Sequence, residues 1–320
     1  MVQDLTAATD VARPQEVGIV AFEATSVDTL STAATLALGV SPTSKRGDYR
    51  LAVRLQRRGA QGAVEAMDMH RRANGEVDLR YVGRIRKRTG FLDRTRPIQP
   101  GISVGHVRVT AGTLGTFVQT TDGSVRILSN NHVLADENQG VEGDDIVQPG
   151  TIDGGVMPGD RVGSLDRFID LQTGAAANLV DCALAAIDDG VETVTDRPVG
   201  EHEPIGGVVD EDTVIDLVEK WGRTTGHTHG RVTAFELDNV RVGYDIGVVR
   251  FDDQLEIEAT GAESFSDGGD SGSLIVTEGG RMAAALLFAG SQTGGQGNLG
   301  LTYANPITTV LEALQVQLLS

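Results

Sequence analysis

The chain has 320 residues and a formal net charge of −18 at pH 7, and this length predicts about two domains. The sequence has no run of about 18 apolar residues, which excludes a helical membrane protein. Charge is uneven, because residues 1–100 carry 16 Lys and Arg against 11 Asp and Glu, whereas residues 101–320 carry 11 against 34. The acidic part would repel phosphates, so nucleic acid is not an expected partner.

The first 90 residues predict a small α/β domain. Val17–Phe22, Tyr49–Leu55 and Val77–Ile85 have the apolar or alternating patterns of strands. Val27–Leu38 and Gly59–Asn74 have the patterns of helices. We expect a regulatory or docking role for this domain, as a propeptide-like inhibitor, a partner-binding domain or an oligomerisation element.

A basic stretch, Arg84–Arg88, stands near the end of this domain, with Arg71 and Arg72 before it. We interpret it as a solvated face that docks on the acidic part of the chain, with a nucleic acid or another acidic partner as the alternative. Phe91–Pro100 follows and holds two prolines among charged residues, which predicts a linker over residues 91–100.

From residue 101 the chain consists of short β-rich runs separated by Gly, Asp and Asn. The runs form two series, which predict a mainly β fold with one barrel over residues 101–200 and a second over 201–320. An apolar stripe near the end predicts a C-terminal helix that packs on the last barrel. The stripe consists of Ile307, Val310, Leu311 and Leu314.

Cys182 is the single cysteine, so no intramolecular disulfide is possible. Met1–Thr6 has no basic patch followed by an apolar run, so a secretory signal peptide is not expected. Together these features predict a cytoplasmic protein. A nucleophilic role for Cys182 is the lesser interpretation, because the apolar run Leu179–Leu184 is typical of a buried thiol.

The strongest local motif for chemistry is Gly-Asp-Ser-Gly-Ser at residues 269–273. A serine hydroxyl is a weak nucleophile at neutral pH, so it needs a base and backbone N–H groups aimed at the developing oxyanion. Flanking glycines permit the tight turn that this requires. Ser271 is therefore a candidate nucleophile, and a polar surface turn is the alternative for this motif alone.

A histidine and an aspartate stand in two further β-rich contexts. His132 follows the run that ends at Ser129 and opens an apolar segment. Asp181 lies inside the apolar run Leu179–Ala185, where burial is costly unless a partner compensates. A histidine oriented by the carboxylate is such a partner. A surface histidine and a turn-capping aspartate are the alternatives when each residue is taken alone.

The order His132, Asp181, Ser271, with gaps of 49 and 90 residues, resembles that of the chymotrypsin/trypsin family. The α/β-hydrolases run Ser, Asp, His, and subtilisins run Asp, His, Ser. The resemblance implies a chymotrypsin-like double six-stranded β-barrel and a serine endopeptidase with these three residues as its catalytic triad.

In the family, this serine turn also forms the oxyanion hole. The resemblance assigns the hole to the N–H groups of Gly269 and Ser271, with Asp270 holding its shape. In trypsin this aspartate pairs with a newly cut N-terminus. Here about 100 residues precede the first predicted barrel, so the same activation switch is not expected.

The resemblance also implies substrate-binding positions. Phe288, Ala289, Gly290 and Ser291 match the family's substrate-binding strand. The specificity-setting position, six residues before the serine, falls on Phe265. This residue is not acidic, so a preference for Lys or Arg does not follow, although Asp267 lies close to it in the sequence.

A closer resemblance is to a subgroup of bacterial and plant trypsin-like proteins that includes the plant NARROW LEAF 1 protein. It covers roughly residues 84–312 and implies a disulfide-free trypsin-like fold behind an N-terminal extension. The motifs that carry it are Ile102–His106, Thr110–Gly115, Leu128–Ala135, Gly222–Gly226, Gly268–Leu274 and Leu286–Gly290.

Other histidines give weaker signals. His106 competes for the role of base but lies one or two strands too early. His227 and His229 alternate at strand spacing, but zinc would need a third ligand that the sequence does not indicate. We expect neither a metal nor another cofactor.

The predicted function is therefore peptide-bond cleavage through an acyl-enzyme, with a protein or peptide as substrate. An esterase with the same triad, and a binding or scaffold module that keeps the fold without turnover, are the alternatives. No membrane partner is expected, and homo-oligomerisation stays open.

Overall fold

The computed structural model describes residues 19–21, 36–42, 49–55, 76–81, 91–210, 213 and 215–319. The chain divides into two compact units. One comprises Met1–Thr25 together with Thr89–Ser320, and the other comprises Ser26–Arg88.

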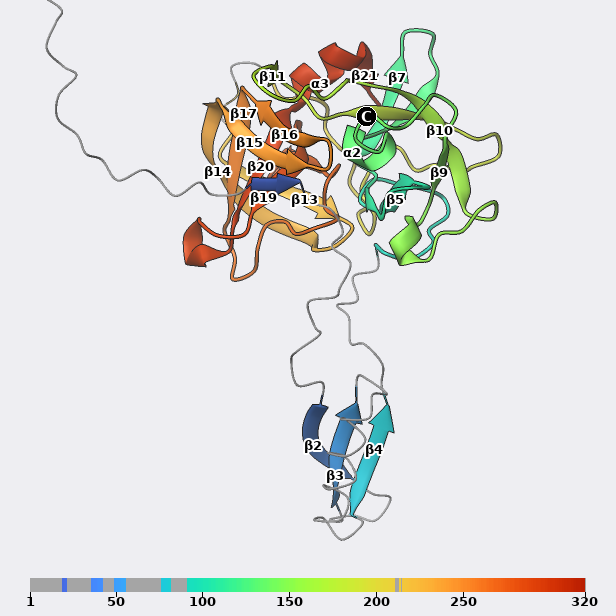
Figure 1. Ribbon diagram of the computed structural model, residues 1–320, viewed down its shortest axis with the longest axis vertical. Coiled ribbons are helices and arrows are strands. Elements are labelled where there is room, and N and C mark those ends of the chain that lie inside the picture. Colours follow the sequence, from blue (N-terminus) through green and yellow to red (C-terminus); the bar gives the residue numbers. More distant parts are fainter. Residues whose placement is uncertain are drawn as a thin grey trace, which may run out of the picture. The chain divides into compact units, whose positions relative to one another are not determined.

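The smaller unit contains a three-stranded sheet in the order β2-β3-β4 (Figure 1). The strands are β2 (Leu36–Pro42), β3 (Tyr49–Leu55) and β4 (Val77–Tyr81). β2 and β3 are antiparallel, and β3 and β4 are parallel.

Two of the strands predicted for this unit are confirmed, β3 and the start of Val77–Ile85. The helix predicted over Val27–Leu38 is wrong at its end, because Leu36–Leu38 belong to β2. The rest of that range, the helix predicted over Gly59–Asn74 and the basic stretch Arg84–Arg88 lie outside the described residues.

The first large sheet follows the order β21-β7-β8-β12-β10-β9-β5-β6 and forms a half-barrel. Its strands are antiparallel wherever they pair. The strands are β5 (Ser103–His106), β6 (Gly112–Thr113), β7 (Thr116–Thr120), β8 (Val125–Ser129), β9 (Asp145–Val147), β10 (Arg161–Phe168), β12 (Ala183–Ile187) and β21 (Val316–Leu318).

The second large sheet contains a closed barrel, because β20 pairs back to β19 after the order β19-β18-β13-β14-β17-β20. Four further strands extend from β19 in the order β1, β15, β16, β11. The strands are β1 (Ile19–Ala21), β11 (Ala177–Asn178), β13 (Leu217–Gly222), β14 (Gly226–Leu237), β15 (Val240–Tyr244), β16 (Gly247–Phe251), β17 (Gln254–Ala259), β18 (Leu274–Thr277), β19 (Ala283–Ser291) and β20 (Leu301–Pro306).

The predicted C-terminal helix is present as α3 (Ile307–Leu314). It ends at Leu314, the last residue of the apolar stripe, because Gln315 adopts a left-handed conformation and Val316–Leu318 then pairs with β7. The four stripe residues are buried in one cluster with residues of both sheets, such as Leu128 and Leu286. The helix therefore packs between the two barrels and joins them.

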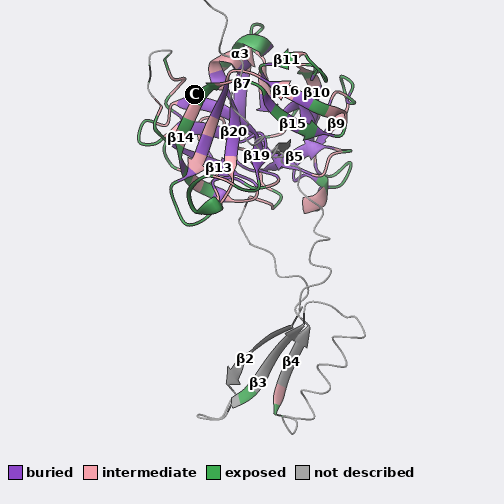
Figure 2. Ribbon diagram, turned by 60° about the vertical axis from the view of Figure 1, so that its left-hand side comes forward, coloured by how far each residue is buried: buried purple, intermediate pink, exposed green. Residues whose placement is uncertain are grey.

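Buried residues concentrate on the strands of both barrels (Figure 2, purple). The prediction of a mainly β, two-barrel, chymotrypsin-like architecture is confirmed, with one barrel closed and the other half-closed. In the segment predicted to be a linker, Ile98 is fully buried in the first barrel's core and its N–H donates to Glu192 O.

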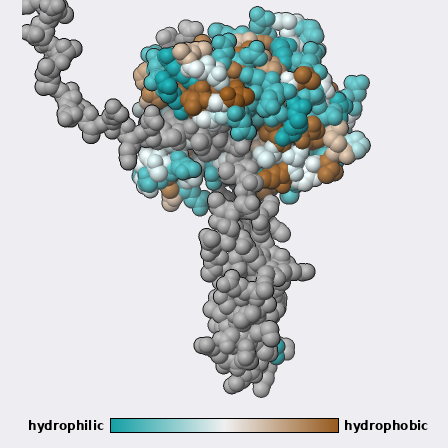
Figure 3. Space-filling view, viewed as in Figure 1, coloured by the Kyte–Doolittle hydropathy of each residue, from teal (hydrophilic) through white to brown (hydrophobic). Residues whose placement is uncertain are grey.

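The face in Figure 3 is mostly hydrophilic, with hydrophobic residues in separate small areas. The exposed large apolar side chains are dispersed along the sequence, for example Val156, Phe235 and Val248. In the part of the chain that the structure describes, no helix is both long and apolar enough to span a membrane.

Candidate active site

His132 and Asp181 are in direct contact where the two barrels meet. His132 lies on α2 (Asn131–Leu134), a short helix directly after β8 (Figure 1). Asp181 lies between β11 and β12 and is fully buried. The imidazole Nδ1 is 2.5 Å from Asp181 Oδ2. An ionised carboxylate only accepts hydrogen bonds, so Nδ1 carries the proton of a neutral ring and Nε2 is the basic nitrogen.

The Asp181 carboxylate accepts hydrogen bonds at both of its oxygens. Oδ1 accepts the backbone N–H groups of Asn131, at 2.7 Å, and His132, at 3.3 Å. Oδ2 accepts the Tyr244 hydroxyl at 2.7 Å as well as His132 Nδ1. This donor set offsets the cost of burying the aspartate that the sequence placed in an apolar run.

Tyr244 is a hydrogen-bond partner of Asp181 that the sequence did not indicate. It ends β15 in the second sheet, and its ring is edge-on to His132 with 5.8 Å between centroids. Burial and the neighbouring Asp181 charge raise the pKa of the Tyr244 hydroxyl well above its usual range, so it stays a donor. Alternation of buried Val240, Val242 and Tyr244 was the available signal, but it gives no indication of the hydroxyl's partner.

We expect Tyr244→Phe to lower the free energy of unfolding by about 1–3 kcal/mol, because a buried carboxylate loses a charge-assisted hydrogen bond. Tyr303→Phe is the matched control, since its hydroxyl donates to the partly exposed Glu256 at 3.2 Å. Urea unfolding of both variants measures the difference. Equal losses in the two variants would contradict a special role for the Tyr244 hydroxyl.

Ser271 sits on a turn in which the two flanking glycines have left-handed conformations, with φ of +94° at Gly269 and +91° at Gly272. A Cβ on Gly272 would lie 2.1 Å from Ser129 Oγ. The Ser271 carbonyl accepts the Thr113 N–H at 2.8 Å. The turn is therefore packed against β6 and the end of β8, the strand that leads to His132.

Asp270 points away from the turn into a buried set of donors. Its Oδ1 accepts the Thr224 N–H at 2.7 Å, and its Oδ2 accepts the Thr225 hydroxyl at 2.6 Å. Lys220 Nζ lies 3.1 Å from Oδ2, and both charged side chains are fully buried. Sequence reasoning assigned Asp270 the task of shaping the turn but missed Lys220, which looked like one residue of a strand.

The residues predicted to bind substrate lie at two places in the second barrel. Phe288–Ser291 form the end of β19 and are all buried. Phe288 packs against Phe251 with ring centroids 4.5 Å apart, and its carbonyl lies 3.5 Å from Ser271 Oγ. Phe265 is buried in the barrel core. Asp267 is exposed, and its N–H donates to Asp270.

The chain resembles known proteins in its fold. No family model matches the sequence, and no curated protein matches it. The solved structures that resemble it are chymotrypsin-fold serine proteases of bacteria. Cellulomonas bogoriensis chymotrypsin is 19% identical, with 69% of this chain and 98% of that chain covered and a TM-score of 0.47.

Two further structures give similar values. Thermobifida fusca protease A is 20% identical, with 70% and 98% covered and a TM-score of 0.48. A glutamic acid specific serine protease, described as using a histidine triad in substrate binding, is 22% identical, with 69% and 100% covered and a TM-score of 0.49.

His106, the competing candidate for the base, belongs to a separate pair. It is fully buried, its Nε2 lies 3.0 Å from Asp144 Oδ2, and its Nδ1 accepts the Arg108 N–H at 3.1 Å. With both nitrogens engaged in the first barrel, this histidine ties β5 to the loop before β9. Cys182 is buried, and desolvation followed by the Asp181 charge raises the pKa of its thiol well above the usual range, which disfavours the nucleophilic thiolate.

His227 and His229 do find a third candidate metal ligand in the structure. Their ring nitrogens and a carboxylate oxygen of Glu219 lie within 4.8 Å of one another. Glu219 already accepts a hydrogen bond from His227 Nε2 at 2.7 Å and lies 3.7 Å from Arg281 Nε. These protein partners account for the carboxylate without an ion, so we interpret the cluster as a polar network on the outside of the barrel.

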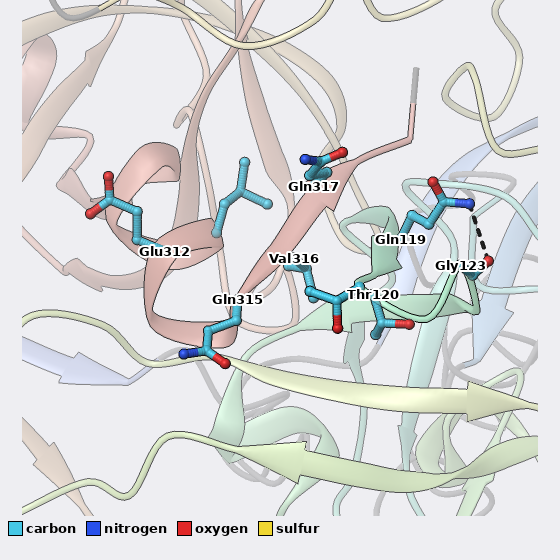
Figure 4. A pocket seen from close by; sticks show the side chains of 9 residues that line it. Gln119, Thr120, Gly123, Glu312, Gln315, Val316 and Gln317 are labelled. Carbon is cyan, nitrogen blue, oxygen red and sulfur yellow. Dashed lines mark hydrogen bonds between the residues drawn. The ribbon is translucent and has the colours of Figure 1, made fainter.

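A pocket elsewhere on the molecule contains none of the predicted site residues (Figure 4). It lies between β7 and the segment that joins α3 to β21. Both polar and apolar side chains line it, and Gln119 Nε2 donates to Gly123 O there at 3.1 Å. We assign it no part in the chemistry described below.

Proposed function

We propose that the chain is a serine endopeptidase that uses Ser271, His132 and Asp181 as a catalytic triad. The observation that carries the proposal is the buried Asp181, which accepts His132 Nδ1 at 2.5 Å beside the glycine-flanked Ser271 turn. A buried aspartate costs stability unless hydrogen-bond donors or an opposite charge compensate for its lost hydration. An imidazole held with Nε2 as its basic nitrogen is the part that a serine nucleophile requires.

In the proposed reaction, Ser271 Oγ attacks a peptide carbonyl while His132 Nε2 takes the hydroxyl proton. His132 then gives this proton to the leaving amine, which breaks the C–N bond and leaves an ester on Ser271. Water, deprotonated by the same nitrogen, hydrolyses the ester. Asp181 stays ionised and stabilises the imidazolium formed in each step.

The oxyanion would be held by the backbone N–H groups of Gly269 and Ser271. Support for this assignment comes from the turn's fixed geometry, since Asp270 anchors it from behind through Thr224, Thr225 and Lys220. Preorganised donors of this kind give much of the rate enhancement of acyl transfer because they need no rearrangement during the reaction.

We also propose substrate contacts, a subgroup and a location for this chain. Phe265 and residues 288–291 would contact the substrate, with a preference for uncharged side chains because Phe265 is apolar. The six sequence motifs support the subgroup that includes NARROW LEAF 1. The lone, buried Cys182 is compatible with the predicted cytoplasmic location.

The test is covalent labelling with a small fluorophosphonate over several hours. We expect one adduct per chain, located on Ser271 by mass spectrometry of the digested protein, because the probe mimics the acylation step. Ser271→Ala should carry no adduct, and His132→Ala should slow labelling strongly. A folded chain that stays unlabelled, and that cleaves neither casein nor a peptide library, both as the wild type and with strand β1 disrupted, would refute the proposal.

A further inference from the structure

A short strand far from the barrels in sequence lies beside the candidate site. β1 (Ile19–Ala21) pairs antiparallel with the end of β19, with Ile19 opposite Ser291, Val20 opposite Gly290 and Ala21 opposite Ala289. On its other side it pairs in parallel with β15. In Figure 1 it is the short dark-blue arrow among the orange strands, and it belongs to the same compact unit as the barrels.

The pairings show which edge of β19 it occupies. β20 and β18 both pair with β19 at Ala285 and Leu286, so they lie on opposite edges there. β20 and β1 both pair at Ala289 and Gly290, so they also lie on opposite edges. β18 and β1 therefore share one edge of β19.

The Ser271 turn sits between these two strands along that edge. Gly272 N–H donates to Leu287 O at 2.8 Å, and Ser271 Oγ is 3.5 Å from Phe288 O. Residues 289–291, which β1 covers, come next. Because β1 is antiparallel to β19, Ala21 is its residue nearest Phe288, and the strand runs towards the nucleophile.

We propose, on the basis of the serine peptidase function proposed above, that Ile19–Ala21 fills the peptide-binding edge of this enzyme as an internal, substrate-like segment. An exposed strand edge binds extended peptides through its main-chain groups. A segment of the same chain competes at an effective concentration on the order of mM. The segment thus slows peptide cleavage until it is displaced or removed.

The register also defines a substrate class. A peptide bound in the register of β1 has one residue opposite Ala289, as Ala21 is in β1. Its next residue then lies opposite Phe288, whose carbonyl is beside Ser271 Oγ. In the sequence, Phe22 and then Glu23 follow Ala21. The preferred substrate is therefore an extended peptide with Ile-Val-Ala-Phe before the cleaved bond. Its apolar character agrees with the apolar Phe265.

The first test changes Val20 in the full-length chain. Val20→Pro removes a backbone donor from β1, and proline is excluded from central strands. We expect fluorophosphonate to label Ser271 at least ten-fold faster in this variant than in the wild type. Ala12→Pro, outside β1, is the matched control and should label at the wild-type rate.

The second test does not depend on enzymatic activity. Val20→Cys with Gly290→Cys, in the Ser271→Ala background, should form an internal disulfide on mild oxidation, detected by mass after digestion. Cys182 is buried and serves as an internal reference. The pair Val248→Cys with Gly290→Cys should cross-link much less, because β15 and β1 separate their strands and Val248 is exposed.

The third test uses Val20→Pro to measure substrate preference. A fluorogenic peptide with Ile-Val-Ala-Phe before the reporter amine should have a kcat/KM at least ten-fold above that of its Ile-Val-Ala-Lys counterpart. Equal values would overturn the substrate class.

The outcomes separate this inference from the proposed function. Labelling of Ser271 at equal rates in wild type and Val20→Pro, without the disulfide, would overturn the substrate-like segment and leave the peptidase standing. Absence of labelling and cleavage in both proteins would refute the peptidase, and the inference with it.

Discussion

Asp181→Asn is expected to lower kcat/KM about 10⁴-fold at neutral pH, the magnitude found for this change in serine peptidase triads. Oδ1 can keep the Asn131 N–H as a donor, which places the new NH₂ group against His132 Nδ1 and the Tyr244 hydroxyl. A ring that must accept a hydrogen bond at Nδ1 carries its proton on Nε2. The imidazole then cannot take the proton of Ser271.

The chain contains its own control for this variant. Asp144 pairs with the buried His106 at 3.0 Å in the first barrel, away from Ser271. Asp144→Asn should keep kcat/KM within a few-fold of the wild type. Steady-state kinetics on a peptide substrate would compare the two variants, with circular dichroism to show that both are folded. A similar loss in both would indicate a structural effect and would remove Asp181 from the proposed triad.

The architecture followed from local sequence because β-rich runs and turn residues are short-range signals. The apolar stripe of α3 also marked a real helix. Its end, however, is set by β21, which pairs with β7 some 200 residues earlier. The helix predicted over Val27–Leu38 was wrong at Leu36–Leu38 for the same reason, since antiparallel pairing with β3 sets that strand.

Part of the candidate site was also predictable from local sequence, and part depends on contacts between distant segments. The order and spacing of His132, Asp181 and Ser271 were sequence signals, and the structure puts the first two in contact. The roles of Lys220 and Tyr244 come from contacts with distant residues. Lys220 binds Asp270, 50 residues away, and Tyr244 binds Asp181, 63 residues away. The alternation of each strand predicts which face its side chains occupy, but it does not predict which carboxylate they contact.

The structure also explains why a glycine stands at position 222. Gly222 was noted only as part of a family motif, and a Cβ there would lie 2.4 Å from Asp270 Oδ1 and 2.8 Å from Lys220 Nζ. The position admits glycine because a buried ion pair passes directly beside the backbone. This close approach ties the β13 hairpin to the Ser271 turn.

Lys220→Met should therefore affect both folding and chemistry. Lys220 and Asp270 are fully buried and 3.1 Å apart. Removal of one partner leaves an uncompensated buried charge, so we expect a loss of about 3–5 kcal/mol in the free energy of unfolding. The Asp270 carboxylate would move towards water, and the turn that carries the Gly269 and Ser271 N–H groups would move with it. Loss of oxyanion donors predicts a fall in kcat of about 10²–10³-fold.

Two companion variants distinguish the ion pair from a general loss of charge. Lys220→Met with Asp270→Asn removes both charges, so it should recover much of the stability while activity stays low, because the carboxylate that anchors the turn is gone. Arg250→Met breaks the partly exposed pair with Asp252 at 2.6 Å and should cost far less stability than Lys220→Met, because solvent screens this pair. Urea unfolding and the rate of fluorophosphonate labelling measure the two effects. If Lys220→Met kept the wild-type labelling rate, Asp270 would not depend on its buried partner to hold the oxyanion hole.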